Sequence, residues 1–203
     1  ERGADVNAVG NEGWTALMLA AENGREEACD LLIRRGAKIN LVDEDKDGKT
    51  ALMLAAQNGH REVCYLLIKR VAKKDLADKD GKTAMMLAAE NGHYAVCDLL
   101  IGIGAKIDLA DKDGKTAMML AAENDHERVG DLLIRGKARR SLADKDGKTV
   151  KNTNKKTALS YQCTTAFLNP ELPSHVSGVR EIHSTGGLAE VSKEKDATVE
   201  KRE

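Results

Sequence analysis

The chain has 203 residues, with 32 Lys and Arg against 33 Asp and Glu, a formal net charge of −1 and 2% aromatic residues. This balance argues against binding of the whole chain to nucleic acid or to anionic membranes, and the aromatic residues are too few for the stacking platforms of single-strand binders. No apolar run approaches the roughly 18–20 residues that span a bilayer, so we predict no membrane insertion.

A sequence motif recurs at a nearly constant spacing along most of the chain. Its most regular copy is Asp78–His93, and similar copies begin at Asp45 and Asp111. A looser copy runs from Gly10 to Arg25, and a broken copy begins at Asp144. A fixed period in this range is typical of stacked repeat proteins. The glycines that mark the motif are Gly13, Gly48, Gly81, Gly114 and Gly147, which lie 35, 33, 33 and 33 residues apart.

Each repeat has the pattern of a turn followed by two short helices. The turn contains Asp-Gly, because Gly tolerates the positive φ of a tight turn, and the Thr that follows is placed to cap a helix. This first helix is rich in Ala, Leu and Met and is expected to end at an Asn-Gly pair such as Asn58-Gly59. The second helix, as at Arg61–Ile68, has apolar residues at helical spacing. Helices of about eight to ten residues are marginal alone, so the copies must stack into an all-α solenoid.

The repeated pattern resembles the ankyrin repeat from residue 1 to about residue 149. The matching motif is Asp-x-x-Gly-x-Thr-x-Leu/Met-x-x-Ala-Ala-x-x-Gly-His, then Leu-Leu-Ile and Gly-Ala-x-Ile/Val-Asn/Asp, and it occurs four times in series. The chain departs from the family in two places and is similar there to ankyrin families expanded in parasitic protists. Ala replaces the usual Pro after Thr, and Met replaces the usual His, which is expected to exchange a hydrogen bond for flexible packing. The positions are Ala16, Ala51, Ala84 and Ala117, and Met18, Met53, Met86 and Met119.

The pattern divides the chain into four segments. Residues 1–9 are interpreted as the remnant of a preceding repeat, because Glu1–Asn7 aligns with Arg34–Asn40, and the chain is expected to be a piece of a longer protein. Residues 10–149 form four repeats plus the start of a fifth, and residues 150–169 a degenerate partial repeat or cap. Residues 170–203 have few large apolar residues and are predicted to be disordered. The first full repeat is expected to expose an apolar flank.

Several positions break the regularity of the repeats. Val71 replaces a Gly after the second helix, and a β-branched residue is strained in the left-handed region, so this junction is expected to deviate or fray. Repeat four has Lys137 at the corresponding position and Gly130 where the other repeats have Cys, so it is expected to be the least stable. In repeat three, Leu99 is assigned to the core, with a cost of roughly 2–5 kcal/mol for Leu99→Ala.

Two patterns imitate metal sites. Asp43, Asp45, Asp47 and Gly48 resemble the start of a calcium loop, but Leu54 occupies the position of the bidentate Glu. A His follows the first helix in three repeats, and side chains one repeat apart are expected to make turn hydrogen bonds rather than to converge on a metal. We therefore predict no metal site. The three residues are His60, His93 and His126.

The cysteines and the remaining polar residues do not form a chemical constellation. Cys29, Cys64 and Cys97 occupy equivalent positions on helices expected to lie about 8–10 Å apart, beyond disulfide reach. They are assigned to the core, as free thiols in a reducing compartment. Cys163 stays unassigned. No nucleophile with a base, paired carboxylates or phosphate loop is present, so we predict no enzyme activity and no cofactor.

The resemblance implies that partner proteins dock on the concave face, which the hairpin tips and the exposed ends of the first helices form. We predict a non-enzymatic scaffold that binds a partner protein, is monomeric and is intracellular, in the cytoplasm. Trp14 is the leading contact, because exposed Trp is enriched in binding hot spots, and the alternative is a Trp folded over a neighbouring stem or over a missing repeat. The predicted partner-binding residues are Trp14, Glu12, Glu22, Lys46, Asp47, Lys49, Gln57, Lys79, Asp80, Lys82, Glu90, Lys112, Asp113, Lys115 and Glu123.

Two other functions stay open at this point. The chain is alternatively the regulatory ankyrin arm of a larger enzyme, such as a kinase, with the catalytic domain upstream of Glu1. Segment 135–156 carries nine basic and two acidic residues, which is typical of a solvated edge but also of an anion or nucleic-acid contact. The basic residues are Arg135, Lys137, Arg139, Arg140, Lys145, Lys148, Lys151, Lys155 and Lys156.

Overall fold

The computed structural model describes residues 4–10, 13–44, 46–139 and 142–149, all within the first of two compact units, Glu1–Pro170. The predicted cap 150–169, the predicted disordered tail 170–203 and Cys163 lie outside these residues. The described part contains helices and isolated β-bridges and no extended strand. The helices are α1 (Ala16–Glu22), α2 (Glu26–Arg34), α3 (Ala51–Gln57), α4 (Arg61–Lys69), α5 (Ala84–Glu90), α6 (Tyr94–Gly102), α7 (Ala117–Glu123) and α8 (Glu127–Arg135).

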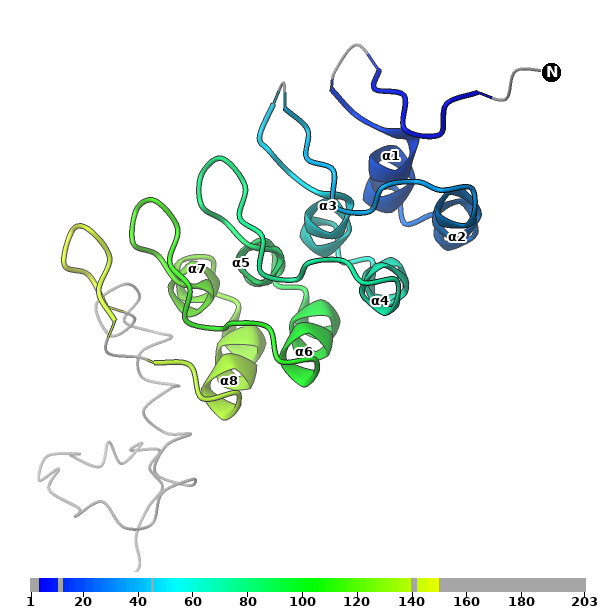
Figure 1. The fold of residues 1–203 in the computed structure, drawn as a ribbon. Helices are drawn as coiled ribbons and strands as arrows, with labels where there is room; N and C mark the ends of the chain where they lie inside the picture. The colour runs from blue at the N-terminus through cyan, green and yellow to red at the C-terminus, as the bar shows by residue number, and fades with distance from the viewer. Residues whose placement is uncertain (1–3, 11–12, 45, 140–141, 150–203) are drawn as a thin grey trace, which may run out of the picture. The chain divides into compact units, whose positions relative to one another are not determined.

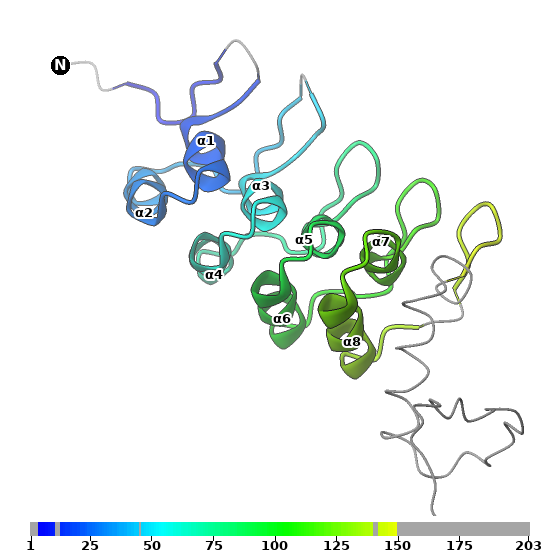
Figure 2. The ribbon, with the colours of Figure 1, turned by 180° about the vertical axis from the view of Figure 1, so that it is seen from behind.

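The helices pack in two parallel rows. The first helices of the repeats, α1, α3, α5 and α7, form one row, and the second helices form the other (Figure 1). Each helix contacts the other helix of its own repeat and the equivalent helix of an adjacent repeat. The hairpins project from the row of first helices on the side away from the second helices, as Figure 2 also shows from behind. The predicted all-α solenoid is confirmed.

A threonine caps each first helix, as the motif predicts. The backbone N–H of Met18 donates to Oγ1 of Thr15 at 3.3 Å, and the equivalent bond recurs in the other three repeats. In repeats one and two the thioether of the same Met accepts the N–H of the capping Thr at 3.5 Å. We expected these Met side chains only to pack. In repeats one and two this expectation is wrong, because the Met sulfur also accepts a weak hydrogen bond. The first helices have seven residues, fewer than predicted.

The core lies between the two rows and is built from Leu and Met side chains together with paired alanines. The paired alanines of the first helices are buried, so neighbouring helices approach closely, and Cys29, Cys64 and Cys97 are 0% exposed, as predicted. The assignment of Leu99 to the fully buried core is wrong by one position. Leu100 on α6 is 0% exposed, whereas Leu99 is only partly buried at the edge of the core. On a nine-residue helix, a shift of one residue turns the side chain by about 100°.

Among the described residues, three that are not Gly adopt the left-handed conformation. Val71 has φ +72°, Asp125 has +59° and Lys137 has +72°, at positions where glycines stand in other repeats. The expected deviation at Val71 is wrong. The N–H of Val71 donates to the carbonyl oxygen of Ile68, and the N–H of Ala72 donates to that of Leu67, as in the regular repeats. The repeat geometry is therefore kept, and the strain remains in the backbone of Val71.

The N-terminal end of the stack exposes apolar side chains, as predicted for an uncovered repeat. Leu19 on α1 is 50% exposed, whereas the equivalent Leu54 on α3 is 3% exposed because repeat one covers it. The segment before repeat one still makes a repeat-like contact. The carbonyl oxygen of the Asn7 side chain accepts the N–H of Lys38, as the side chain of Asn40 accepts the N–H of Lys73.

Candidate functional site

The hairpin tips of repeats two to five are stabilised by an aspartate at the start of the turn. In repeat three the Asp78 carboxylate accepts the N–H groups of Asp80 and Lys82 at 3.0 and 2.8 Å. Burial raises the pKa of Asp78, and these two hydrogen bonds oppose the shift. In repeat two the Asp43 carboxylate is buried and accepts the N–H of Gly48 at 2.8 Å, so the calcium-like stretch closes a turn.

In repeats three and four, a lysine of the tip reaches the end of the first helix. Nζ of Lys82 lies 2.8 Å from the Glu90 carboxylate, and Nζ of Lys115 lies 2.7 Å from that of Glu123. The hydrogen bond to Glu123 raises the pKa of Lys115. The two partners are eight residues apart in sequence, and the first helix of the repeat, α5 or α7, lies between them. The tips and the first helices therefore form one continuous polar surface in these repeats.

In repeat two, the tip lysine forms a different ion pair. Its first helix ends in Gln57, which carries no charge, and Lys49 pairs instead with Asp47 of its own tip, at 3.0 Å. The side-chain oxygen of Gln57 is buried and has no hydrogen-bond partner in the structure. The tip lysines and the helix-end residues were predicted as partner contacts, but the Lys–Glu ion pairs of repeats three and four were not predicted. The eight-residue spacing of Lys and Glu was the available signal.

Trp14 occupies the position of these lysines in repeat one. It is half-buried against the core, and the ammonium group of Lys46 lies 5.2 Å from the centroid of its ring. Its indole N–H is buried and has no hydrogen-bond partner among the described residues. The prediction of an exposed Trp is therefore wrong, because Lys46 of the next tip covers the ring in a cation–π contact. The contact with Lys46 agrees with the alternative of a Trp folded over a neighbouring stem.

The other predicted contacts lie on the same surface with different exposure. Glu12 lies outside the described residues. At the tips, the side chains that project furthest are exposed, and the lysines that turn towards the helix are half-buried along with most of the helix-end residues. The exposed residues are Lys46, Asp47, Lys79, Asp80, Lys112, Asp113 and Glu123, and the half-buried ones are Glu22, Lys49, Gln57, Lys82, Glu90 and Lys115.

The histidines join repeats to one another rather than stabilise their own turns. Nε2 of His93 lies 2.8 Å from the Gln57 carbonyl oxygen at the end of the preceding first helix, and His60 and His126 make the same contact with Glu22 and Glu90. The prediction of hydrogen bonding is confirmed, but the turn assignment is wrong. No group of His, Cys, Asp and Glu in the described residues has the arrangement of a metal site.

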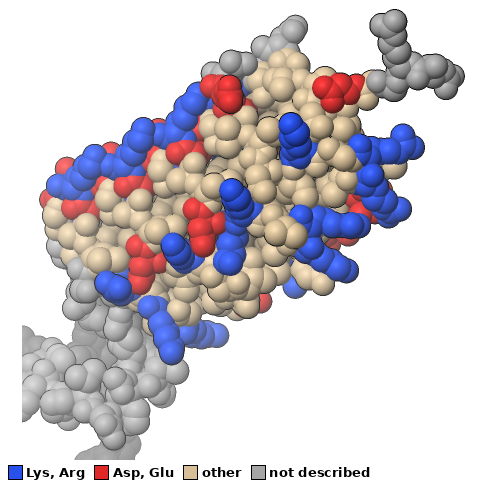
Figure 3. Space-filling view, viewed as in Figure 1, with Lys and Arg blue, Asp and Glu red and all other residues tan. Residues whose placement is uncertain are grey.

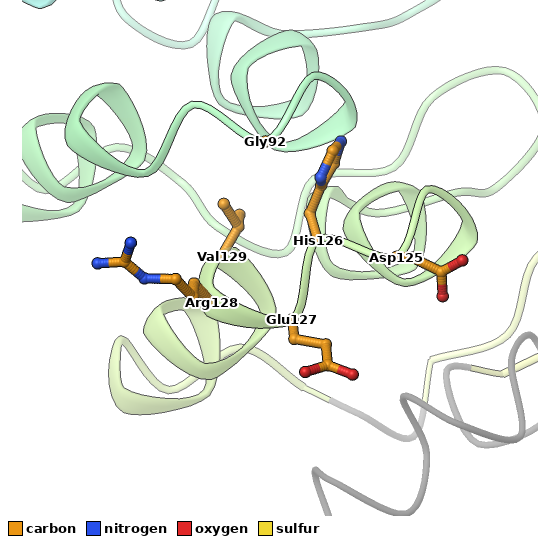
Figure 4. Close-up of a pocket in the computed structure, with 6 residues that line it drawn as sticks. All are labelled: Gly92, Asp125, His126, Glu127, Arg128 and Val129. Atoms are coloured by element: carbon orange, nitrogen blue, oxygen red, sulfur yellow. The ribbon is translucent and has the colours of Figure 1, made fainter.

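A hollow of about 330 Å³ lies beside His126, where the α7–α8 turn meets Gly92 (Figure 4). Its charged side chains, Asp125, Glu127 and Arg128, point away from one another rather than towards a common point. Arg128 lies over the ring of Tyr94, with its guanidinium carbon 5.1 Å from the ring centroid. This arrangement does not bring a nucleophile, a base and an oxyanion donor together.

The buried cysteines have the properties of core residues. Burial raises the pKa of Cys29 to about 11 and those of Cys64 and Cys97 to about 12, and the carboxylates of Glu26 and Glu62 add to the shift at Cys29 and Cys64. At neutral pH these thiols are protonated, and the thiolate that reacts with electrophiles is scarce.

The basic segment 135–156 is described only in part, because residues 140–141 and 150–156 lie outside the described residues. Arg135 and Lys137 are exposed. Arg139 pairs with Asp108 at 3.4 Å and Lys148 with Asp146 at 3.3 Å, so two of the described cations already face carboxylates. An anion or nucleic-acid contact here stays a prediction.

None of the eight helices in the described part of the chain is both long and apolar enough to cross a membrane.

Comparison with protein families agrees with the helix pairs. A family model described as ankyrin repeats (3 copies) matches residues 40–111 and 70–146, and a model described as ankyrin repeat matches residues 12–44. Repeats of this kind are generally protein–protein interaction modules and are typically non-catalytic. Because the matches span more than half of the sequence and coincide with the four helix pairs, the chain belongs to the ankyrin-repeat family.

Proposed function

We propose that the chain is a non-enzymatic scaffold that binds a partner protein on its concave face, the surface of the hairpin tips and the first helices. The observation that carries the proposal is the pairing of Lys82 with Glu90 and of Lys115 with Glu123. These ion pairs join the tip and the helix of each repeat, and stacking places the joined surfaces side by side. A partner that spans several repeats meets one extended polar surface.

Repeat one gives this surface an end with different chemistry. Trp14 replaces the lysine that pairs in repeats three and four, whereas Glu22 keeps the glutamate, so the polar pair is absent there. Lys46 covers the Trp14 ring, and in the part of the chain that the structure describes the buried indole N–H has no acceptor. A partner that displaces Lys46 gains a large flat aromatic surface and a donor, which are the features of interface hot spots.

The test compares two aromatic substitutions on different surfaces of the stack. Trp14→Ala removes the ring at the concave face, and Tyr65→Ala removes a ring that is 52% exposed on α4, in the row of second helices. A partner isolated from cell lysate with the full chain is titrated against both variants and against Glu22→Lys, after circular dichroism has established that each variant is folded.

Trp14→Ala and Glu22→Lys are expected to weaken the complex by about tenfold or more, as for a hot spot, while Tyr65→Ala binds as the unaltered chain does. Unchanged affinity in both concave-face variants, or a loss confined to Tyr65→Ala, contradicts the proposal. The Glu22→Lys variant keeps the test informative if Trp14→Ala destabilises repeat one.

A further inference from the structure

The hairpin tips of repeats two to five are fixed to one another by backbone hydrogen bonds. The N–H groups of Lys79, Lys112 and Lys145 donate to the carbonyl oxygens of Asp47, Asp80 and Asp113, at 2.7, 2.9 and 2.8 Å. Each bond joins a residue of one tip to the equivalent turn of the preceding tip. The tips therefore form a continuous edge in which identical turns recur one repeat apart, and Figure 3 shows Lys or Arg and Asp or Glu side chains in succession along this edge.

The residue at the end of the first helix decides which charges of a tip are neutralised. Where this residue is Gln57, Lys49 turns back to Asp47 of its own tip. Where it is Glu90 or Glu123, the tip lysine binds the helix instead. The tip carboxylates of repeats three and four are then left without an ion pair in the described residues, and both side chains are exposed. These two residues are Asp80 and Asp113.

The exposed lysines of the same edge are not equivalent either. Nζ of Lys79 donates to the carbonyl oxygens of Glu44 and Lys46, both at 2.6 Å, in the longer hairpin of repeat two. The side chains of Lys112 and Lys145 make no such bond in the described residues. The middle of the edge therefore presents Asp80, Lys112, Asp113 and Lys145 as two negative and two positive charges, and each sign recurs after one repeat.

This spacing matches one face of an α-helix. Packed helices lie about 8–10 Å apart, which sets the distance from one repeat to the next, and an α-helix rises about 10.5 Å in seven residues. A helix also places two side chains, at i and i+4, next to each other in every heptad, so it can offer an acid and a base to each tip. A polyproline helix presents one residue per turn on a face, and a strand alternates its faces, so neither offers two rows of charge.

We propose that the tips of repeats three to five bind an α-helix of a partner protein that carries one acidic and one basic residue per heptad on its docking face. The basic residues pair with Asp80 and Asp113, and the acidic residues pair with Lys112 and Lys145. Exposed ion pairs are individually weak, so several form together and the complex depends strongly on salt. The inference rests on the proposed binding function and names the class of partner and its contacts.

The test uses a designed peptide and substitutions outside the contact. The probe is a helical peptide of about four heptads, with Glu and Lys at i and i+4 in every heptad, titrated by fluorescence anisotropy into the full chain at about 50 mM and 300 mM salt. Two peptides of equal composition serve as controls, one with scrambled charges and one with the charges on a Pro-rich three-residue repeat. Circular dichroism verifies that the probe is helical.

Two variants with substitutions at helix ends change the free charges in opposite directions. Glu90→Gln with Glu123→Gln copies the Gln57 arrangement, so Lys82 and Lys115 turn to Asp80 and Asp113, and the peptide is expected to bind about fivefold more weakly, as for two lost exposed pairs. Gln57→Glu should draw Lys49 away from Asp47, expose a third carboxylate and strengthen binding.

Equal binding of the ordered and scrambled peptides, tighter binding of the Pro-rich peptide, or an unchanged affinity in the double variant overturns the inference. Failure here is distinct from failure of the proposed function. A lysate partner that is lost with Glu22→Lys but unaffected by Glu90→Gln and Glu123→Gln leaves the concave face as the binding surface and removes only the helix as its ligand.

Discussion

A methyl group on Gly59 would lie 2.6 Å from Nδ1 of His93, one repeat further along the stack. The same ring holds the Gln57 carbonyl oxygen at 2.8 Å through Nε2, so the imidazole is clamped between two positions of the preceding repeat. Gly24 with His60 and Gly92 with His126 repeat this contact. The Gly-His coupling is therefore a joint between repeats, and Gly59 needs both its positive φ of +76° and its missing side chain.

Gly59→Ala is expected to destabilise the chain by about 2 kcal/mol or more, because it adds a steric overlap with His93 to the strain of a left-handed Ala. His93→Ala alone is expected to cost about 1 kcal/mol for the lost hydrogen bond. Chemical denaturation of both single variants and the double variant measures the coupling. The cost of Gly59→Ala should fall when His93 is already Ala, since only the backbone strain remains, and strictly additive costs would show that the ring does not clamp Gly59.

Val71→Gly is expected to stabilise the chain by about 1 kcal/mol, because Val71 has φ +72° and its side chain is 81% exposed, so strain is relieved and little packing is lost. The matched control is Gly104→Val. Gly104 has the same φ of +72°, and a side chain there meets no atom within 4 Å, so only backbone strain is added. Urea titration should show changes of opposite sign in the free energy of unfolding of the two variants. A lower stability of Val71→Gly would show that the backbone at Val71 is not strained.

Leu100→Ala is expected to cost roughly 2–5 kcal/mol, because Leu100 is fully buried at the centre of the third repeat. Leu99→Ala, one residue earlier on α6, should cost less than half as much, because Leu99 lies at the edge of the core. Guanidinium titration of the two variants measures the difference. Equal costs would mean that the helix is rotated from the orientation described here.

The buried thiols predict an alkaline loss of stability. The folded-state pKa of Cys64 is about 12 and the ordinary value is 9.0, so the unfolded chain releases the proton first as pH rises. The contribution of the neutral thiol to stability is complete below about pH 9 and is lost between about pH 9 and 12. Denaturation of Cys64→Ala at several pH values should show a shallower loss than the unaltered chain does.

Reaction with a thiol reagent at pH 8 provides a second readout of the same burial. In a Cys163→Ser background, labelling of Cys29, Cys64 and Cys97 should require unfolding, because all three are 0% exposed. Rapid labelling of the folded chain, or identical pH profiles for Cys64→Ala and the unaltered chain, would contradict the assignment of these residues to the core.

Local features of the repeats were easier to predict from the sequence than contacts between repeats. Predictions that depend on neighbouring residues in the chain were confirmed, as with the capping threonines and the buried cysteines. Predictions of what a side chain meets across repeats were less successful. Trp14 was predicted to be exposed and is covered by Lys46, and the histidines were expected to make turn hydrogen bonds although they bind the end of a helix in the preceding repeat.

The sequence by itself determined the solenoid, its period and the face that the tips and first helices share, because turns, caps and short amphipathic helices are specified by residues a few positions apart. Only the tertiary structure decided which charges are neutralised. Lys49 and Lys82 occupy equivalent positions in nearly identical tips, yet one binds Asp47 and the other Glu90. The difference arises at the end of the neighbouring helix, whose distance from the tip is fixed only when the repeat folds.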